Sequence, residues 1–292
     1  MPWKLSDPDL HRVFTALSIP LALSGESLVF FGVRGAVPVR SSEASATGQP
    51  GELDGSKPVN YTTLRCTIGQ WSPKSGKLDM FLGSTVPTMR YVEGAADRGG
   101  RGCNQVFPGL YRFTKGQHRA GTPTGHWAFR EAGEKLICRT DDDGLYEPET
   151  DDVSLDSPAD NLHAAWGTES YSSAGCQVVS GKPGNGDWDK FKTCGYQVQQ
   201  EVYRYLLLPS GVWAALAKSG EPAICIGSVG ERAKAVQEAL VSKGLLTSGD
   251  EDGIFGCQSG LALLRFQRQR SELAADAICS ADDARVLGVV GW

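Results

Sequence analysis

The apolar pattern of the chain changes character near Lys218, and this change limits the folds available to it. Before that point, apolar residues form short runs typical of β-strands, separated by glycine-rich turns. The predicted strands cover residues 27–33, 62–71, 77–82, 109–114, 127–130, 201–208 and 211–217. Beyond residue 230, apolar residues recur three and four apart, as on one face of a helix. The sequence therefore predicts a mainly β domain over residues 1–217 and a small all-α three-helix module over residues 218–292.

Some segments carry a more detailed prediction. The run 202–208, Val-Tyr-Arg-Tyr-Leu-Leu-Leu, is typical of a strand that is buried on both faces. Residues 41–58 and the glycine-rich 93–102 lack apolar periodicity and are predicted to be loops. In the first region, helices are expected only at 8–17 and as a short turn at 188–192. In the second region, helices are expected at 231–243, 258–269 and 281–287.

Composition excludes several classes of partner. The formal net charge of the 292 residues is −5, so there is no basic field to hold nucleic acid or anionic lipid. No run approaches the roughly 18 apolar residues that a membrane span requires. The eight cysteines include no Cys-x-x-Cys pair, which argues against a zinc ribbon. We therefore expect no nucleic-acid partner and no membrane span.

Four segments of the helical module form a recognisable pattern. They are Val-Gly-Glu-Arg-Ala-Lys-Ala-Val-Gln-Glu-Ala-Leu-Val-Ser-Lys-Gly-Leu-Leu at 229–246, Asp-Gly-Ile-Phe-Gly at 252–256, Leu-Arg-Phe-Gln at 264–267 and Asp-Ala-Ile-Cys-Ser at 276–280. Gly253 and Gly256 allow tight turns, and Ile254 and Phe255 are expected to point inward and anchor the first loop. The amides of Gln237 and Gln267 are expected to satisfy backbone groups of the loops.

This pattern resembles the peptidoglycan-binding three-helix family. The resemblance implies that the module binds the glycan or the stem peptides of the bacterial cell wall. It assigns the module's functional pattern to Gln237, Asp252, Gly253, Phe255 and Gln267. Ala277 stands where the family's second loop has glycine, and Cys257 stands where proline is common.

The richest pattern of the first region is Asn-Leu-His-Ala-Ala-Trp-Gly-Thr-Glu-Ser-Tyr-Ser-Ser-Ala-Gly-Cys-Gln-Val-Val, residues 161–179. His163 precedes Cys176 by thirteen residues, and Ser173 and Gly175 come directly before the cysteine. A thiol with an ordinary pKa of about 8.5 is only a few per cent thiolate at neutral pH. A nucleophilic cysteine therefore needs an imidazole to accept its proton.

The same segment resembles the signature of the L,D-transpeptidases, in which a histidine on one strand activates a thiol on the next. The resemblance implies that Cys176 is the nucleophile and His163 its base, held by the carbonyl of Ala164 or Ala165. It also implies that Gly175 lets backbone N–H groups turn toward an oxyanion. Ala174 and Val178 depart from the family, which usually has histidine and arginine at these places.

The activity implied is attack on a tetrapeptide stem, with loss of D-alanine and formation of a thioester on the enzyme. An amine acceptor then gives a cross-link or an exchanged D-amino acid, whereas water gives a tripeptide, and the sequence does not decide among them. The residues expected to contact substrate are Tyr111, His118, Arg119, Arg139, Trp166 and Ser173. Arg119 or Arg139 is expected to take the stem carboxylate.

A metal is not expected. His118 and His126 are close in sequence, but no third ligand follows at a convincing spacing, so we predict no metal and no other cofactor. Two other functions stay open: a non-catalytic wall-binding protein in which Cys176 is structural, and a zinc-dependent wall carboxypeptidase.

The location of the substrate raises a question of delivery. Asp7 and Asp9 lie where a Sec signal peptide would be basic, and polar residues at 24–27 interrupt the apolar run that follows. We therefore expect synthesis in the cytoplasm, export by another route, and action in the periplasm or cell wall. An antibacterial effector of a type VI injection system fits this expectation, with a secretion component or an immunity protein as a further partner.

Overall fold

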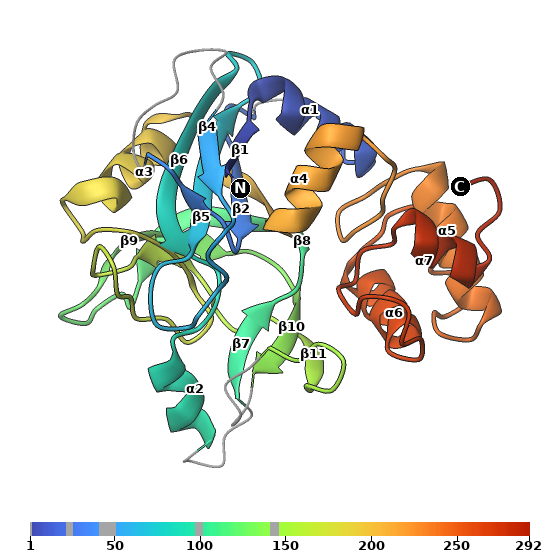
Figure 1. Cartoon of the computed structure of the whole chain (residues 1–292). Helices are drawn as coiled ribbons and strands as arrows, with labels where there is room; N and C mark the ends of the chain where they lie inside the picture. Colours follow the sequence, from blue (N-terminus) through green and yellow to red (C-terminus); the bar gives the residue numbers. More distant parts are fainter. Residues whose placement is uncertain (1, 22–25, 41–50, 97–101, 141–145) are drawn as a thin grey trace.

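An eight-stranded closed barrel forms the centre of the molecule (Figure 1). The structure, a computed structural model, describes residues 2–21, 26–40, 51–96, 102–140 and 146–292. The order around the barrel is β12-β13-β6-β5-β2-β14-β8-β9, and two neighbouring pairs, β12–β13 and β2–β14, run parallel. The strands are β2 (Val29–Arg34), β5 (Cys66–Ser72), β6 (Lys77–Ser84), β8 (Gly109–His118), β9 (His126–Glu131), β12 (Leu162–Ala164), β13 (Gln177–Val179) and β14 (Val202–Pro209).

Two three-stranded sheets and seven helices complete the described part of the chain. The first sheet is β1 (Pro2–Leu5), β4 (Gly51–Asp54) and β3 (Val37–Pro38), and the second is β11 (Val153–Asp156), β10 (Lys135–Thr140) and β7 (Cys103–Val106). The helices are α1 (Asp7–Ala16), α2 (Met89–Ala96), α3 (Gly186–Gln197), α4 (Ser210–Ser219), α5 (Glu231–Ser242), α6 (Cys257–Gln267) and α7 (Ala281–Leu287). The prediction of a mainly β region followed by helices is confirmed at this level. None of the described helices is both long and apolar enough to cross a bilayer.

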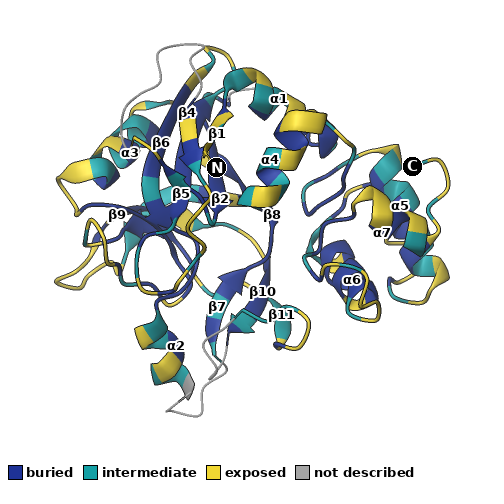
Figure 2. Cartoon of the chain, in the orientation of Figure 1, coloured by how far each residue is buried: buried dark blue, intermediate teal, exposed yellow. Residues whose placement is uncertain are grey.

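Strand β14 shows why the barrel is covered on its outside. Tyr203 and Tyr205 face the interior cluster, whereas Leu206 and Leu208 belong to a second cluster outside the barrel. Helices α1 and α4 contribute residues to that outer cluster, and Figure 2 shows exposed residues on the outer side of both helices. Successive side chains of a strand point to opposite faces, so a strand between two cores is buried on both faces. Its one charged residue, Arg204, is paired with the buried Glu26. The predicted burial of this run on both faces is confirmed for residues 203–208, whereas Val202 is exposed.

Several local predictions are wrong. Residues 211–217, predicted as a strand, lie within α4, whose Trp213, Leu216 and Ala217 are buried at helical spacing. The predicted loop 41–58 contains β4, which pairs with β1 and β3, while its residues 41–50 lie outside the described part of the chain. The predicted loop 93–102 overlaps α2 up to Ala96, and its residues 97–101 are not described.

The helical module has a core of its own but also completes the core of the barrel. Val236, Leu240 and Phe266 belong to the module's own cluster. Ile226 and Leu264, in contrast, belong to the same cluster as the barrel interior. Hydrogen bonds join the two parts as well, since the Ile226 carbonyl accepts from the Leu110 N–H at 2.7 Å. The sequence boundary at 217/218 therefore falls inside α4 and within a continuous packed structure.

Candidate functional site

His163 and Cys176 meet at the end of two neighbouring strands. Strands β12 and β13 pair in parallel with His163 opposite Val178, and Cys176 directly precedes β13. One ring nitrogen of His163, one of His118 and the Cys176 Sγ all lie within 4.8 Å of one another. The segment between the two strands returns the chain to the starting end of β12, because parallel neighbours need a crossover connection. His163 and Cys176, thirteen residues apart in the sequence, are brought together in this way.

The His163 ring is held in one orientation and one tautomer. Its Nδ1 lies 2.8 Å from the Ala164 carbonyl oxygen, which accepts the Nδ1 proton. This is one of the two carbonyls named from the sequence. The lone pair of the neutral ring is consequently on Nε2. The side chain is 3% exposed, and burial, together with the neighbouring His118, holds the pKa of His163 well below its ordinary value. The ring is therefore neutral and available as a base.

Cys176 rests as a neutral thiol. It is 9% exposed, and burial raises the pKa of Cys176 to about 12, with the negative charge of Asp160 acting in the same direction. A preformed thiolate–imidazolium pair is therefore not the resting state, and the sulfur loses its proton only as it reacts. Slow thiol labelling at neutral pH is consequently compatible with a catalytic cysteine.

The turn before Cys176 corrects two predictions. The Ser173 hydroxyl donates to the Cys176 carbonyl at 2.7 Å and accepts from the Gly175 N–H at 3.0 Å. Because its hydroxyl both donates and accepts within the turn, Ser173 shapes the turn rather than binding a substrate. The Gly175 N–H is already used, so the Cys176 N–H is the remaining candidate donor to an oxyanion.

Glycine is nevertheless required at position 175, because there is no room for a side chain. Its φ is +151°, and a Cβ at this position would lie 2.6 Å from an Asp160 carboxylate oxygen and 2.6 Å from the Asn104 Cβ. Any side chain would therefore displace the turn that carries Cys176.

A buried ionic network supports the segment that leads into β12. The Lys135 ammonium lies 3.0 Å from the Glu131 carboxylate and donates to the Asp160 carbonyl at 3.0 Å. Glu131 also accepts the Asp160 N–H at 2.6 Å. Burial raises the pKa of the Asp160 carboxyl to about 7. Sequence analysis missed these residues; the only signal was a lysine at the start of the apolar run Leu136–Cys138, and it does not indicate a partner.

Three of the four histidines gather at this site, from three different strands. The His118 ring stacks on His163 with centroids 4.0 Å apart and planes 15° apart. His126 lies 5.5 Å from His118 and 5.4 Å from His163, again between ring centroids. Burial lowers the pKa of His118 to about 4, and burial also lowers the pKa of His126. The cluster is therefore a group of neutral imidazoles beside a neutral thiol.

Two further predicted substrate residues lie at the edge of this cluster. Arg119 follows His118 at the end of β8 and is exposed, and its charge contributes to the lowered pKa of all three histidines. Trp166 is 41% exposed and sets its ring edge-on to His126 at 5.4 Å. His118, Arg119 and Trp166 are thus the predicted substrate residues that the structure brings to the site.

The other two predicted substrate residues are placed elsewhere or already paired. Tyr111 is 3% exposed inside the barrel, and its hydroxyl donates to the Phe107 carbonyl at 2.9 Å. That assignment is wrong, because a residue in the barrel core has no access to a surface substrate. The Arg139 guanidinium lies 2.8 Å from the Asp156 carboxylate and also bonds Asn104. Arg139 is therefore engaged within the second small sheet and is not free to take a stem carboxylate.

The first loop of the module is built around Gln237. Its amide oxygen accepts from the Gly253 N–H at 2.8 Å, and its amide nitrogen donates to the Ile254 carbonyl and the Asp252 carboxylate, both at 3.1 Å. This is the predicted satisfaction of loop groups, and the contact is confirmed. Phe255 is fully buried, as predicted, but Ile254 is 60% exposed, so its predicted inward position is wrong.

Gln267 does the same for the second loop. Its amide oxygen accepts from the Ala277 N–H at 2.9 Å, and its nitrogen donates to the Ile278 carbonyl at 3.0 Å. Ala277 has a φ of +60°, the left-handed conformation that Gly253 adopts in the first loop with a φ of +78°. Gln237 and Gln267 are each 1% exposed. Both therefore stabilise the loops through hydrogen bonds, and neither can contact a ligand directly.

The hydrogen bonds of Gln237 predict an effect on stability. Gln237→Ala should lower the free energy of unfolding by about 2–4 kcal/mol, because it leaves several buried loop groups without a partner. Gln269→Ala, at an exposed position of the same module, should change it by less than about 0.5 kcal/mol. Urea unfolding followed by circular dichroism measures both. Equal urea midpoints for the two variants would show that the hydrogen bonds of Gln237 do not stabilise the protein.

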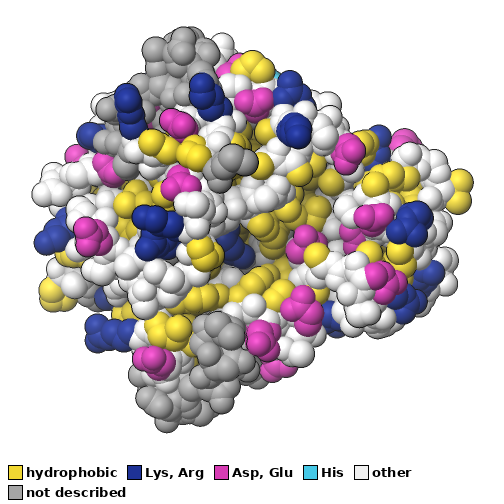
Figure 3. All heavy atoms as spheres, in the orientation of Figure 1, with side chains coloured by type: hydrophobic (Ala, Val, Ile, Leu, Met, Phe, Trp, Pro, Cys, Tyr) yellow, Lys and Arg dark blue, Asp and Glu magenta, His cyan; other side chains and the backbone are white. Residues whose placement is uncertain are grey.

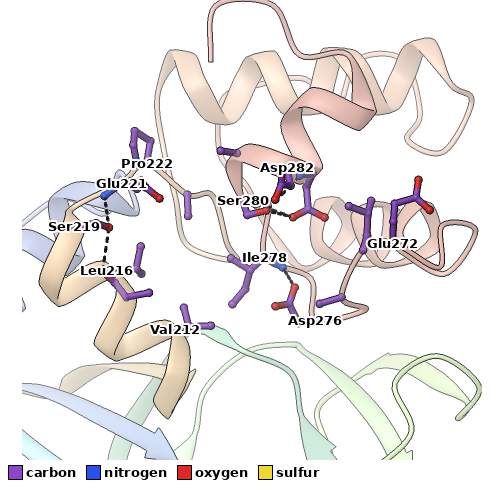
Figure 4. Close-up of a pocket in the computed structure, with 16 residues that line it drawn as sticks. Val212, Leu216, Ser219, Glu221, Pro222, Glu272, Asp276, Ile278, Ser280 and Asp282 are labelled. Carbon is purple, nitrogen blue, oxygen red and sulfur yellow. Dashed lines mark hydrogen bonds between the residues drawn. The ribbon is translucent and has the colours of Figure 1, made fainter. Parts of the chain in front are cut away.

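A separate cavity of about 360 Å³ lies where the module meets α4. Figure 3 shows hydrophobic side chains in the hollow between the two parts, with acidic residues along the side of the module. Figure 4 shows Val212 and Leu216 of α4 facing Ile278 across this space, with Asp276 beside it. His163 and Cys176 are not among its lining residues, so the cavity does not belong to the cysteine site.

Asp276 makes stability depend on pH. Burial raises the pKa of this carboxyl to about 7, and Asp283 adds to the shift, whereas a hydrogen bond from the Ile278 N–H opposes it. The folded state therefore holds the proton more tightly than the unfolded state does. The stabilisation is complete below about pH 4 and is lost as the pH rises toward 7. Asp276→Asn should flatten this decline, measured as unfolding free energies between pH 4 and pH 8; parallel curves for both proteins would contradict it.

No family model, curated protein or solved structure matches the chain.

Proposed function

We propose that the protein is a cysteine-dependent enzyme of L,D-transpeptidase type that acts on the stem peptides of peptidoglycan. The observation that carries the proposal is the arrangement of His163 and Cys176. The imidazole is oriented by the Ala164 carbonyl, its Nε2 lone pair is free, and the Cys176 Sγ lies within 4.8 Å of a ring nitrogen. A nucleophile, a base and an acceptor that orients the base are the three parts that thiol catalysis needs.

The first half of the reaction transfers an acyl group to the enzyme. The Cys176 proton passes to His163 Nε2 as the sulfur attacks the peptide carbonyl and forms the C–S bond. The Cys176 N–H is the candidate donor to the resulting oxyanion. When the intermediate collapses, the C–N bond breaks, and His163 returns the proton to the leaving amine. D-alanine departs and a thioester remains on Cys176.

The second half depends on the acceptor. An amine loses a proton to His163 as it attacks the thioester, which gives a cross-link or an exchanged D-amino acid, and the thiol is regenerated. Water attacks by the same route and gives a shortened, tripeptide stem. Arg119 is exposed at the edge of the histidine cluster, where it also contacts the Tyr91 hydroxyl, and, since Arg139 is paired, it is the candidate contact for the stem carboxylate. The partly exposed Trp166 ring, which contacts His126, is a second candidate contact for substrate.

The C-terminal module supports a polymeric wall substrate. Its two loops, each stapled by a glutamine, follow the pattern that resembles the peptidoglycan-binding family. A module that holds the polymer raises the local concentration of stem peptides without changing the catalytic residues. A non-catalytic wall-binding protein remains the second candidate, because the same module would support it equally.

The test is mass spectrometry of muropeptides after incubation of purified protein with sacculi and with soluble tetrapeptide muropeptides. We expect loss of tetrapeptide stems and the appearance of tripeptides, cross-linked dimers or, with an added D-amino acid, exchanged stems. An unchanged profile together with pelleting of the protein on sacculi would favour the wall-binding protein instead.

A further inference from the structure

We propose that His118, His163 and Cys176 form a zinc-binding site that reversibly blocks the nucleophile. The three residues come from β8, from β12 and from the turn before β13. Spacing motifs in the sequence could not reveal them, because the ligands are far apart along the chain. The zinc site rests on the geometry of these three residues alone, whereas the block of the nucleophile rests on the proposed function.

The geometry is close to that of a zinc site. One donor atom from each residue lies within 4.8 Å of the other two. In a tetrahedral site with zinc–nitrogen bonds of about 2.0–2.1 Å and zinc–sulfur bonds of about 2.3 Å, donors are about 3.3–3.8 Å apart. The three side chains must therefore approach one another by about 1 Å. Two imidazoles and a thiolate with a fourth, open position are a ligand set that zinc accepts.

Binding changes the protonation of one ligand, because a coordinating cysteine binds zinc as a thiolate. Only the Cys176 thiol must give up a proton, which is released to solvent as the S–Zn bond forms. His163 also has the contact that zinc ligands usually have, since its Nδ1 donates to the Ala164 carbonyl and leaves Nε2 for the metal.

Asn161 limits the strength of the site. Its amide oxygen accepts the Glu131 N–H at 3.1 Å, so its amide nitrogen faces His118 Nδ1 at 3.0 Å. His118 therefore carries its proton on Nε2 in the resting state. Binding through Nε2 needs that proton to move to Nδ1 and the amide to turn, which costs the Glu131 contact. The site is consequently expected to bind zinc reversibly rather than as a permanent structural ion.

This arrangement has a direct consequence for reactivity. A zinc ion on Cys176 and His163 occupies both the attacking sulfur and the lone pair of its base. The bound form cannot attack a peptide carbonyl, and loss of zinc restores both groups together. The chain would therefore be inactive in zinc-rich surroundings and active once zinc is withdrawn.

The binding test uses the full chain and Co²⁺ as a spectroscopic probe, followed by competition with Zn²⁺. We expect one Co²⁺ per chain, with a near-ultraviolet thiolate-to-cobalt band that Zn²⁺ removes. Cys176→Ser should abolish the band, and His118→Gln should weaken binding at least about 10-fold. Cys194→Ser and His11→Gln alter a partly exposed thiol and a histidine outside the cluster, and both should leave the band unchanged.

Asn161→Asp provides a variant that gains affinity. A carboxylate accepts the His118 Nδ1 proton without turning, so zinc should bind about 10-fold more tightly. A purely adventitious thiol site would not respond to this change. Absence of the band in the parent protein, or a band that survives Cys176→Ser, would overturn the zinc site.

Activity assays separate this inference from the proposed function. If the protein freed of metal by a chelator turns over stem peptides and zinc inhibits it, both the proposed function and the zinc block are supported. If chelated protein is active and zinc has no effect, only the zinc block fails. If zinc is required for activity, the thiol mechanism fails and a zinc-dependent hydrolase replaces it.

Discussion

Replacement of Cys176 by alanine should lower the rate of stem-peptide turnover by at least about 10³-fold. The variant removes the sulfur that forms the thioester, and no other described thiol belongs to the three-residue donor group around His163. The fold should persist, because the change deletes one buried atom and typically costs about 1 kcal/mol. Mass spectrometry of muropeptides measures the rate, and circular dichroism measures the fold.

His163→Gln tests whether the two residues act as one unit. We expect a loss comparable to that of Cys176→Ala, and no further loss when both changes are combined, because either change alone removes the covalent route. Cys225→Ala, at another buried thiol, is the matched control and should retain activity. Substantial turnover by Cys176→Ala would contradict the covalent mechanism, and fully additive losses would show that His163 acts independently.

Separation of the two regions should have the second largest effect. A fragment of residues 1–217 should fail to fold cooperatively, because it lacks apolar residues of the barrel's own cluster: Ile226, Leu261, Leu264, Ala275 and Ala277. A buried aliphatic side chain contributes about 1.5–3 kcal/mol, and a domain is stable by only about 5–15 kcal/mol. The cut also removes Gly220, the left-handed residue that ends α4.

The matched control is Arg268→Ala in the full chain. It removes two hydrogen bonds across the same contact, to the Pro148 carbonyl at 2.7 Å and the Asp151 carbonyl at 2.6 Å, but keeps the apolar packing. This variant should stay folded with a reduced midpoint. Thermal unfolding and limited proteolysis compare the three proteins. If fragment 1–217 unfolds as sharply as the full chain, the first region does not need the module in order to fold.

Strands with a strong pattern were predictable, and those with a weak pattern were not. The run around Tyr205 is buried on both faces because it lies between two cores, and its mostly apolar residues make this recognisable in the sequence. Strands β12 and β13 have three residues each, too short for any periodicity. Helix α4 was misread as a strand because Val212, Trp213 and Leu216 satisfy either pattern, and its contact with α1 decides between them.

The candidate site divides in the same way. His163, Cys176 and the carbonyl of Ala164 come from one segment, so a local motif was sufficient to predict them. His118 comes from β8, and Asn161 and Lys135 act through contacts with other strands. Tyr111 and Arg139 were wrongly predicted to contact substrate. The sequence does not show that Tyr111 is buried in the barrel or that Arg139 pairs with Asp156.

The sequence by itself determined the elements that depend on local chemistry. These are the apolar runs of the barrel, the loops that Gln237 and Gln267 staple, and the His163–Cys176 pair. Only the tertiary structure decided which residues surround that pair, whether Cys176 is ionised, and whether the module is separate. Each of these depends on burial and on contacts between segments distant in sequence, and neither is encoded in the spacing of neighbouring residues. The three-histidine cluster is the clearest case, since barrel closure brings together rings that lie 4.0–5.5 Å apart.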